Sequence, residues 1–308
     1  MSFHVIVGAG ATGSVTARLL AEAGERVRLV SRRGDGPPHP QIERISADGN
    51  DTARLTELTE GATTLFNCAM PPYYRWPAEW PPLAAALLTA ATRTGTDYVM
   101  LGNIYGYGEV DGPITEDLPL APVSEKGRVR AAMWHDAQAA YAAGRVRVTE
   151  VRASDFLGAG ATSLYAGMTA PMVLAGESAP YPGDLDAPHS WSHIGDVART
   201  LVAAAGNDDS WGRAWHVPSV SDGSVREVSA RLAAAAAAPA PRLRRMPPAE
   251  LQELGRTRPG LAEVTEMLYL YDRPLYLDSS ATEKSLDLQA APLDTALSEM
   301  VTEWWATR

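Results

Sequence analysis

The first 33 residues read MSFHVIVGAGATGSVTARLLAEAGERVRLVSRR, and their pattern decides how the rest of the chain is interpreted. Residues 3–7 form an apolar run that predicts a strand, and residues 11–22 have the apolar periodicity of a helix, which Gly24 ends. Residues 27–30 predict a second strand. Between the first strand and the helix lies Gly8-Ala9-Gly10-Ala11-Thr12-Gly13. This G-x-G-x-x-G spacing inside a βαβ unit is typical of dinucleotide binding.

Each glycine of this motif has its own physical task. Gly8 permits a tight turn, Gly10 lets the backbone approach a pyrophosphate, and Gly13 lets the helix pack close to the strand. The first helical residues, Ala11 and Thr12, offer backbone N–H groups at the positive end of the helix dipole. The sequence therefore predicts that a dinucleotide pyrophosphate binds at this turn.

The end of the second predicted strand indicates which dinucleotide binds. An Asp or Glu at this place holds the ribose 2′-hydroxyl of NAD. This chain has Ser31, Arg32 and Arg33 instead, and guanidinium groups pair well with a 2′-phosphate. The alternative is a surface turn with two solvated arginines. We expect NADPH or NADP⁺ as the cofactor.

Composition limits the class of protein. The chain has 308 residues, a net charge of −10 and one cysteine, Cys68. The acidic balance argues against a nucleic-acid partner, and a single cysteine excludes an intrachain disulfide and fits a reducing compartment. We expect neither a signal peptide nor a membrane span. We expect a cytoplasmic protein with a small-molecule substrate; the sequence does not indicate its oligomeric state.

Strand and helix patterns alternate as far as residue 152. We expect strands at residues 42–48, 64–69, 98–101 and 146–152, and helices at 52–60, 83–93 and 128–141. This order predicts an α/β fold with a doubly wound parallel sheet of the Rossmann type and a smaller C-terminal substrate-binding part. The expected cofactor domain is residues 1–157. Residues 158–308 are expected to be mainly substrate-binding, with the segment around 189–217 returning to the core.

The second half of the chain is less regular. Residues 164–174 fit either a helix or a strand, and the proline-containing segment 177–190 is expected to be a loop. Helices are expected at 194–205, at 226–238, from Pro247 onward and within 286–305, with a short strand at 214–217. Trp304 and Trp305 are expected to be packing anchors.

Residues that follow the predicted strands are candidates for ligand contact, because ligands bind at the carboxyl edge of a parallel sheet. Asp48 either caps the next helix or contacts adenine. Cys68, Ala69 and Met70 are expected beside the cofactor, with Cys68 as a small buried residue rather than a nucleophile.

An aromatic segment with several prolines follows the fourth predicted strand. Its residues Tyr73, Tyr74 and Trp76 either line a pocket for a flat, apolar substrate or belong to a rigid connection that packs on the following helix. Tyr105, after the fifth strand, is a further candidate for the same substrate pocket.

Several motifs occur in a characteristic order. Besides the glycine motif they are Asn67-Cys68-Ala69, Tyr107-Gly108, Arg152-Ala153-Ser154-Asp155-Phe156-Leu157-Gly158, His193-Ile194-Gly195-Asp196-Val197-Ala198 and Tyr276-Leu277-Asp278-Ser279-Ser280. Together they resemble the short-chain dehydrogenase/reductase superfamily, in particular its extended and atypical branches, which include NAD(P)-dependent epimerases and dehydratases. The resemblance covers nearly the whole chain.

The chain departs from that superfamily at the catalytic positions. The resemblance implies a Ser or Thr after the fifth strand and a Tyr-x-x-x-Lys at the start of the next helix. Those positions hold Asn103, Lys126 and Arg130, and no Tyr-x-x-x-Lys occurs between Tyr107 and Tyr141. Asn103 can donate a hydrogen bond to a carbonyl oxygen, and Arg130 can stabilise negative charge without releasing a proton. Lys126 either acts as an acid, if desolvated, or binds cofactor ribose or phosphate.

The missing pair decides which reaction we expect. The pattern is similar to ketoreductases that tailor aromatic polyketides, such as angucyclinone ketoreductases of the simocyclinone type. The resemblance implies NADPH-dependent reduction of a ring ketone in antibiotic biosynthesis, with the proton supplied, for example, by a hydroxyl of the substrate itself. One alternative is a nucleotide-sugar epimerase or dehydratase, which needs a base; another is a non-catalytic regulator that senses NADP(H).

Other polar residues are weaker candidates. His189 and His193 are four residues apart, but a proline precedes them and no third ligand is near, so no metal site is expected. Asp155, His135 and Tyr165 lie in segments that can reach a pocket, and each is expected to be structural.

Overall fold

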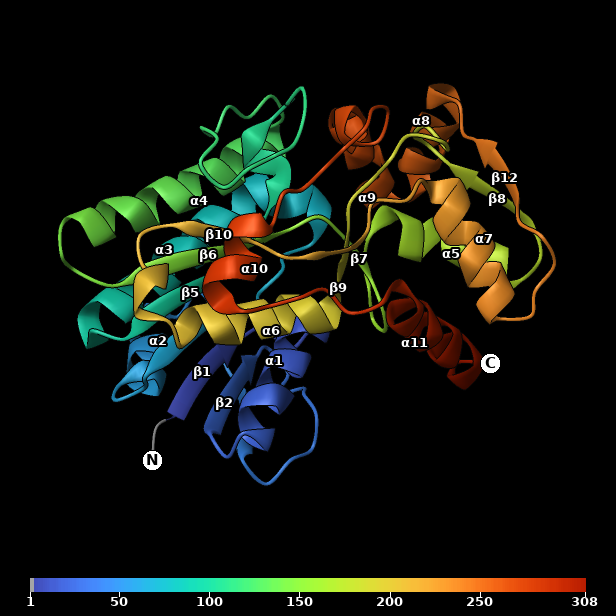
Figure 1. Cartoon of the computed structure of the whole chain (residues 1–308). Helices are drawn as coiled ribbons and strands as arrows, with labels where there is room; N and C mark the ends of the chain where they lie inside the picture. Colours follow the sequence, from blue (N-terminus) through green and yellow to red (C-terminus); the bar gives the residue numbers. More distant parts are fainter. Residues whose placement is uncertain (1–2) are drawn as a thin grey trace.

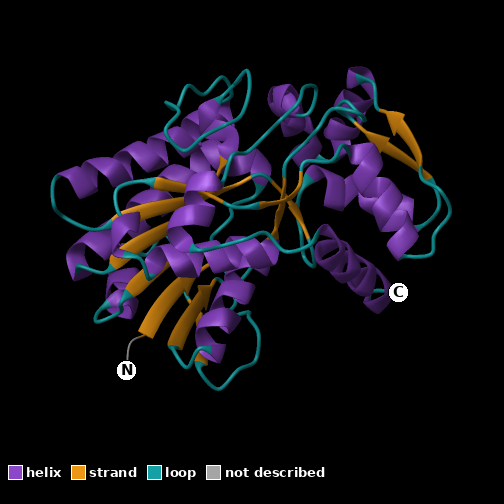
Figure 2. Ribbon diagram, viewed as in Figure 1, coloured by secondary structure: helices purple, strands orange, loops and turns teal. Residues whose placement is uncertain are grey.

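The computed structural model describes residues 3–308, and its centre is a parallel sheet of seven strands (Figures 1 and 2). In spatial order the strands are β10 (Ala214–His216), β6 (Val148–Ala153), β5 (Asp97–Asn103), β4 (Thr64–Asn67), β1 (Phe3–Val7), β2 (Arg26–Ser31) and β3 (Ile42–Ser46). Neighbouring strands pair in parallel throughout. The chain order reverses between β1 and β4, and such a reversal is where open α/β sheets bind ligands. The predicted doubly wound α/β fold is confirmed.

Helices cover both faces of this sheet. α1 (Ala11–Glu22) and α6 (Ile194–Ala205) pack on one face, and α2 (Thr52–Thr59), α3 (Trp76–Thr94) and α4 (Glu125–Ala142) pack on the other. Because side chains alternate along a strand, Val5 and Val7 face the second group of helices whereas Ile6 faces the first. Burial on both faces explains the continuous apolar runs by which the sequence predicted these strands.

Two helices begin earlier than the sequence pattern indicated. α3 begins at Trp76 rather than at residue 83, although it contains Pro81 and Pro82. The side chains of Trp76 and Trp80 are buried, and their burial outweighs the poor helix propensity of the prolines. α4 begins at Glu125, because the hydroxyl of Ser124 accepts a hydrogen bond from the third residue of the helix.

Most of the elements that follow β6 form a second group beside the sheet, on the right in Figure 1, whereas α6, β10 and α10 belong with the sheet. β7 (Asp155–Leu157), β9 (Trp191–His193) and β11 (Ser219–Ser221) form a three-stranded sheet, and β8 (Ser178–Tyr181) pairs in parallel with β12 (Arg242–Arg245). Besides α6, the helices after β6 are η3 (Tyr165–Thr169), α5 (Ala170–Leu174), η4 (Asp208–Ser210), α7 (Val225–Ala235), α8 (Pro248–Thr257), α9 (Pro259–Ala262), η5 (Glu263–Leu270), α10 (Ser280–Leu286) and α11 (Leu293–Ala306). Of these, η4 contacts α6, and α10 contacts α6 and β10 of the central sheet. Two short helical turns, η1 (Tyr73–Arg75) and η2 (Ile104–Tyr107), follow β4 and β5.

Three expectations for this half of the chain are corrected or decided. Residues 165–174 are helical, and the segment 177–190 is not only a loop, because Ser178–Tyr181 pairs with the distant β12. Trp305 is 61% exposed, so the expectation that it anchors the C-terminus by packing is wrong, whereas Trp304 is partly buried. The buried side of α11 consists of Leu293, Ala296, Leu297 and Met300.

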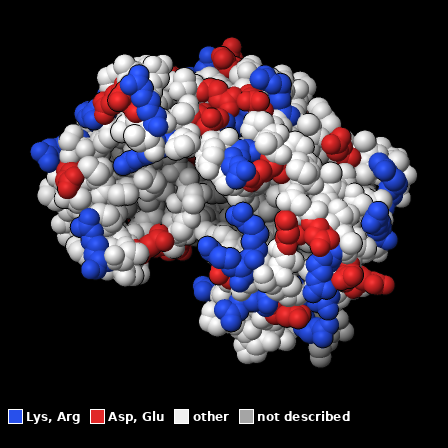
Figure 3. Space-filling model, turned by 180° about the vertical axis from the view of Figure 1, so that it is seen from behind, with Lys and Arg blue, Asp and Glu red and all other residues white. Residues whose placement is uncertain are grey.

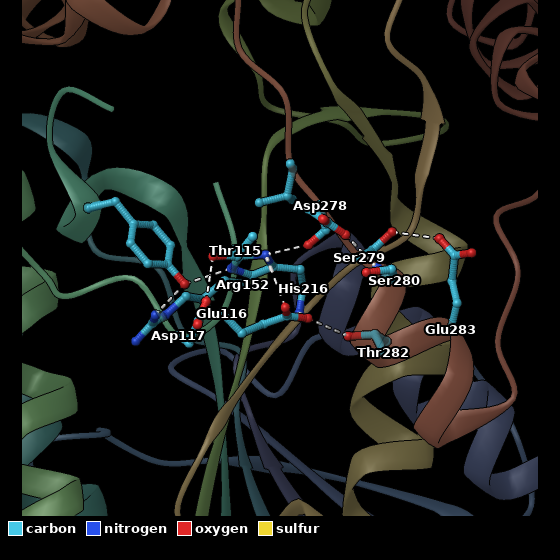
Figure 4. Close-up of polar contacts among 12 residues, drawn as sticks. Thr115, Glu116, Asp117, Arg152, His216, Asp278, Ser279, Ser280, Thr282 and Glu283 are labelled. Carbon is cyan, nitrogen blue, oxygen red and sulfur yellow. Dashed lines mark hydrogen bonds and ion pairs between the residues drawn. The ribbon is translucent and has the colours of Figure 1, made fainter. Parts of the chain in front are cut away.

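A buried polar cluster ties separate segments together beside β10 (Figure 4). The Tyr107 hydroxyl lies 2.6 Å from Nε2 of His216, and Arg152 donates to the same hydroxyl at 2.6 Å. His216 Nδ1 lies 2.8 Å from the backbone oxygen of Asp278. We call these residues, together with Glu116, the His216 cluster; it gives the Tyr107-Gly108 motif a structural task.

The charge on the surface and the length and polarity of the helices can be compared with the composition of the chain. On the face shown in Figure 3, acidic and basic side chains are interspersed over the surface. Within residues 3–308, no helix combines the length and the apolar character that crossing a membrane requires.

Candidate active site

The glycine turn, residues 8–13, has the shape that a pyrophosphate requires. Gly8 has φ +111°, and a Cβ on it would lie 2.3 Å from the backbone oxygen of Cys68. A Cβ on Gly13 would lie 1.9 Å from the backbone oxygen of Gly8, whereas a Cβ on Gly10 would meet nothing within 4 Å. No side chain caps the N-terminus of α1 at Gly10. The turn therefore combines open space with uncapped N–H groups, including those of Ala11 and Thr12, and these features fit a dinucleotide.

The two arginines after β2 have different surroundings. Arg33 is 84% exposed and pairs with Asp35 at 2.8 Å, while the hydroxyl of Ser31 accepts the N–H of Asp35 at 2.9 Å. Arg32 lies in the wall of the cavity described below. Within the part of the chain that the structure describes, Arg32 forms no ion pair, so its guanidinium is available to a ligand.

The remaining residues expected beside the cofactor lie at the ends of β3 and β4. Asp48 is exposed and accepts the N–H of Asn50 at 3.0 Å. The cap of α2 is Asp51, so the expectation that Asp48 caps this helix is wrong. Cys68 is buried beneath the glycine turn, and burial raises the pKa of its thiol to about 12, which suits a packing residue better than a nucleophile. Ala69 follows it, and Met70 is 51% exposed and reaches the cavity.

A cavity of about 660 Å³ opens at the carboxyl ends of β4, β5 and β6. Its apolar wall includes Pro71, Pro72, Tyr73, Trp76, Leu101, Ile104, Tyr105, Phe156, Leu164, Met168, Leu261, Val264, Leu270, Tyr271 and Leu275. Its polar wall consists of Arg32, Asn103, Arg130, Ser154, Asp155, Thr162, Ser163, His189 and Arg258. A large, mostly apolar cavity with a few convergent polar groups is the usual form of a small-molecule site.

The aromatic segment after β4 lines the cavity and packs on its neighbours at the same time. The ring centroids of Tyr73 and Trp76 are 5.1 Å apart, and those of Trp76 and Tyr105 are 6.0 Å apart. All three side chains reach the cavity wall. Tyr74 does not: it is 49% exposed on the outer surface, so the expectation that it belongs to the pocket is wrong.

Asn103 and Arg130 both line the cavity. The Asn103 side-chain oxygen accepts the N–H of Tyr105 at 3.2 Å, and within residues 3–308 its amide nitrogen makes no hydrogen bond. Arg130 lies over the rings of Trp76 and Trp80, 4.6 and 4.4 Å from their centroids, and donates to the backbone oxygen of Leu101 at 3.2 Å. Burial lowers the pKa of Arg130 to about 10. Its buried Nε has no partner among the described residues, so this guanidinium is incompletely bonded.

Lys126 lies elsewhere than the sequence indicated. Its side chain is fully buried and forms ion pairs with Glu263 and, at 2.7 Å, with Glu266. Its ammonium group also lies 4.6 Å from the centroid of the Tyr73 ring, on the far side of the cavity wall. The two expected roles, acid or cofactor ligand, do not fit this position, because η5 supplies both partners of the charge.

Two residues that the sequence analysis did not assign to the site stand in the cavity wall: Asp155, which was expected to be structural, and His189, which was considered only as a metal ligand. Asp155 Oδ2 and His189 Nε2 are 3.0 Å apart. Asp155 lies two residues after the end of β6, and its place at the carboxyl edge of the sheet was a signal that the sequence offered. His189 had no local signal, because only the pairing of β7 with β9 brings it to Asp155. By contrast, His135 is exposed on α4, and Tyr165 is buried against Ser229.

The histidines do not assemble a metal centre. His193 faces Glu299 at 3.0 Å, away from the cavity. Among the described residues there is no group of three or more His, Cys, Asp or Glu side chains that could hold a metal ion.

The fold, the glycine turn and a cavity at the switch point define a dinucleotide-binding α/β protein. Residues 4–217 match the model of the NAD dependent epimerase/dehydratase family. The chain belongs to this family. A comparison with curated proteins found no match.

Solved structures share the whole fold. MoeE5 in complex with UDP-glucuronic acid and NAD is 21% identical, with a TM-score of 0.80 and coverage of 99% of each chain. UDP-glucose 4-epimerase from Thermotoga maritima, solved with UDP-glucose, is 17% identical, with a TM-score of 0.81 over 100% of this chain and 99% of that one. UDP-glucuronic acid 4-epimerase from Bacillus cereus, in complex with NAD, is 15% identical, with a TM-score of 0.79 and coverage of 99% of each chain.

Proposed function

We propose that this protein is an oxidoreductase that holds a nicotinamide dinucleotide at the glycine turn and acts on a carbinol or carbonyl carbon in the cavity. The observation that carries the proposal is the uncapped N-terminus of α1 over the open space at Gly10. Family membership supports the same cofactor class. When bound, the dinucleotide supplies a hydride donor or acceptor.

The chain's own residues have separate tasks in this proposal. Gly8, Gly10 and Gly13, with the N–H groups of Ala11 and Thr12, bind the pyrophosphate. We propose that Arg32 binds a 2′-phosphate, which makes NADP(H) the preferred form. Asn103 donates to the substrate oxygen, and Arg130 stabilises negative charge that develops there.

For the substrate we propose a nucleotide sugar. The family name supports this class, and the three solved structures named above include complexes with UDP-glucuronic acid and UDP-glucose. Arg258, in the cavity wall, forms no ion pair within residues 3–308 and suits an anionic phosphate group.

A flat ring ketone is the second candidate. The aromatic wall formed by Tyr73, Trp76 and Tyr105 favours it, and so does the missing Tyr-x-x-x-Lys, because ketone reduction needs a proton donor besides the hydride and no base. No comparison supports an aromatic polyketide substrate in particular.

Binding and turnover experiments test the proposal. Calorimetric titration with NADPH, NADP⁺, NADH and NAD⁺ measures cofactor affinity. The protein is then incubated with UDP-glucose, UDP-glucuronic acid or a polycyclic quinone, and products are identified by mass spectrometry and NMR, because epimerisation leaves no net change in the cofactor. Absence of dinucleotide binding contradicts the proposal, and tight binding without any turnover supports a regulator instead.

A further inference from the structure

A histidine–aspartate pair lies in the wall of the same cavity that Asn103 and Arg130 line. His189 Nε2 is 3.0 Å from Asp155 Oδ2. The two side chains are 5% and 15% exposed, so the pair is largely shielded from bulk water. Its place among the lining residues nevertheless leaves it in reach of a bound ligand.

The fold holds the His189 ring in place. The backbone N–H of His189 donates to the backbone oxygen of Asp222 at 3.2 Å, and the residue forms a bridge with Leu275. The ring lies 4.7 Å from the ring of Trp191 and stacks on Tyr271 at 6.1 Å between centroids. Rotation of the ring would break these contacts.

The carboxylate partner is held with similar firmness. Asp155 begins β7, and its register partner in β9 is Trp191, two residues after His189. β7 begins two residues after β6 and pairs with β9, the strand that begins two residues after His189. The fold, and not only the side-chain contact, keeps the two residues adjacent.

The second ring nitrogen of His189 is free. Within the described residues Nδ1 makes no hydrogen bond, and it is not among the atoms that are sealed from solvent without a partner. A carboxylate that accepts a hydrogen bond from one nitrogen of an imidazole sets the tautomer and leaves the other nitrogen able to accept or donate a proton. This is the arrangement of a positioned general base.

Other groups of the cavity are poorly suited to proton exchange near neutral pH. Burial, followed by the charge of Asp155, raises the pKa of Tyr105 to about 12 and that of Tyr271 well above its ordinary range. Burial also raises the pKa of Tyr73 strongly. Lys126 is held by Glu263 and Glu266, and arginine retains its proton.

We propose that His189, oriented by Asp155, is the general acid–base residue of this chain and takes the place of the missing Tyr-x-x-x-Lys. This inference rests on the proposed function. In the reducing direction the Nδ1–H bond of protonated His189 breaks and an O–H bond forms on the substrate oxygen. The electron pair of the new C–H bond is the hydride from the cofactor, and water then returns a proton to the imidazole. In the oxidising direction neutral His189 accepts the hydroxyl proton.

The kinetic test compares His189→Gln and Asp155→Asn with the wild-type protein in single turnovers at saturating cofactor and substrate. A positioned acid–base group contributes roughly 10²–10⁴-fold to the rate, and His189→Gln should lose that factor while binding the dinucleotide normally. Its pH profile should lose the limb that His189 contributes. Asp155 and Tyr271 contact His189, and the other titratable or charged side chains of the cavity wall are those of Tyr73, Tyr105, Arg32, Arg130 and Arg258. Asp155→Asn should lose part of the rate, because the ring keeps a hydrogen-bond partner but not the charge.

The matched control is His193→Gln. His193 makes a contact of the same length, 3.0 Å, with Glu299 outside the cavity, so this variant should keep the wild-type rate and pH profile. If His189→Gln retains the wild-type rate and profile, the inference is wrong while the proposed function stands. If the wild-type protein binds no dinucleotide, the proposed function fails, and the role of His189 fails with it.

A second readout needs no cofactor. Long-range ¹H–¹⁵N NMR of the ligand-free protein reports which imidazole nitrogen carries the proton. We expect neutral His189 to be a single tautomer protonated at Nε2 in the wild-type protein and a mixture in Asp155→Ala. A mixture already present in the wild-type protein would overturn the assignment, because Asp155 would then not orient the ring.

Discussion

At the scale of single residues, the two arginines after β2 show that neighbouring side chains decide whether a guanidinium group can bind a ligand. Arg33 is already paired with Asp35 and extends into solvent, whereas Arg32 is unpaired among the described residues and reaches the cavity. Only Arg32 therefore has a guanidinium that a ligand can occupy without first breaking an ion pair.

This difference leads to a prediction about cofactor choice. Arg32→Ala should weaken NADPH binding by about 10- to 100-fold, the equivalent of one hydrogen-bonded charge contact of roughly 1.5–3 kcal/mol, and should change NADH binding little. Arg33→Ala is the matched control and should change neither. Calorimetric dissociation constants for both cofactors decide the matter, and equal losses for NADPH and NADH would remove the 2′-phosphate assignment.

Substitutions at Gly10 and Gly13 are expected to affect stability and dinucleotide binding differently. A Cβ at Gly13 would collide with the backbone of Gly8, whereas a Cβ at Gly10 meets empty space at an ordinary φ of −70°. We predict that Gly13→Ala lowers the thermal midpoint, while Gly10→Ala keeps or slightly raises it, since alanine restricts the unfolded chain by about 0.4–1 kcal/mol.

Gly10→Ala should nevertheless lose dinucleotide affinity, because the new methyl group occupies the space into which the pyrophosphate fits. Thermal unfolding and calorimetry on the same samples measure both properties. A Gly10→Ala protein with wild-type affinity would show that the pyrophosphate does not approach this residue.

At the scale of elements, the contact between η5 and the start of α4 holds one wall of the cavity. Glu266 accepts the backbone N–H of Glu125 at 2.6 Å and also pairs with Lys126, whose second partner is Glu263. A lysine with no exposed surface is stable only with such partners. The charge of Lys126 therefore serves the packing of η5 on α4.

The corresponding prediction compares removal of the cation with removal of the anions. Replacing Glu263 and Glu266 by glutamine leaves Lys126 buried without a counter-charge. Removing the partner of a fully buried charge lowers the free energy of unfolding by about 3–5 kcal/mol. We expect a smaller loss here, because the glutamates are 31% and 26% exposed. Lys126→Met should change the free energy of unfolding far less and leave dinucleotide affinity unchanged. Urea unfolding and calorimetry test this; a large loss of affinity in Lys126→Met would restore the cofactor role that the sequence indicated.

At the scale of the whole molecule, two buried histidines couple stability to pH in opposite directions. Burial lowers the pKa of His216 to about 4, from an ordinary 6.5. Burial also lowers the pKa of His193, but its hydrogen bonds to Asp196 and Glu299 outweigh this effect and raise the value to about 9. His216 resists protonation in the folded state, whereas His193 favours it.

The sign of each contribution follows from linkage. Between pH 6.5 and about 4 the unfolded chain binds a proton at His216 that the folded chain does not, so stability falls as the pH falls. Between pH 6.5 and about 9 the folded chain keeps a proton at His193 that the unfolded chain releases, so stability falls as the pH rises. Over its pH range, each histidine changes the free energy of unfolding by at most about 3 kcal/mol. The two ranges form the acid limb and the alkaline limb of the stability profile.

Urea unfolding across this pH range should therefore show maximal stability near pH 6.5. His216→Gln should flatten the acid limb only, and His193→Gln the alkaline limb only. An acid limb that is unchanged in His216→Gln would show that other groups, such as the buried carboxylates, dominate acid unfolding.

Much of the fold could be predicted because its signals are local. The apolar runs of β1, β4 and β5, the glycine turn and the helix periods of α1 and α6 each depend on residues within one segment. The start of α3 was missed, because burial of Trp76 and Trp80 against other elements outweighs the local signal of the prolines. β8 was missed since its partner β12 lies far along the chain.

The candidate site divides in the same way. The amino-acid sequence by itself determined the glycine turn, the arginines after β2, the place of Asn103 and Arg130 and the absence of a Tyr-x-x-x-Lys, because each is a spacing within one βαβ unit or one strand–helix step. Only the tertiary structure decided that Lys126 is neutralised by η5, that Tyr74 faces solvent and that His189 meets Asp155. The physical reason is that burial and pairing depend on which distant segments of the chain pack together around the cavity. The pairing of β7 with β9, for example, brings His189 to Asp155.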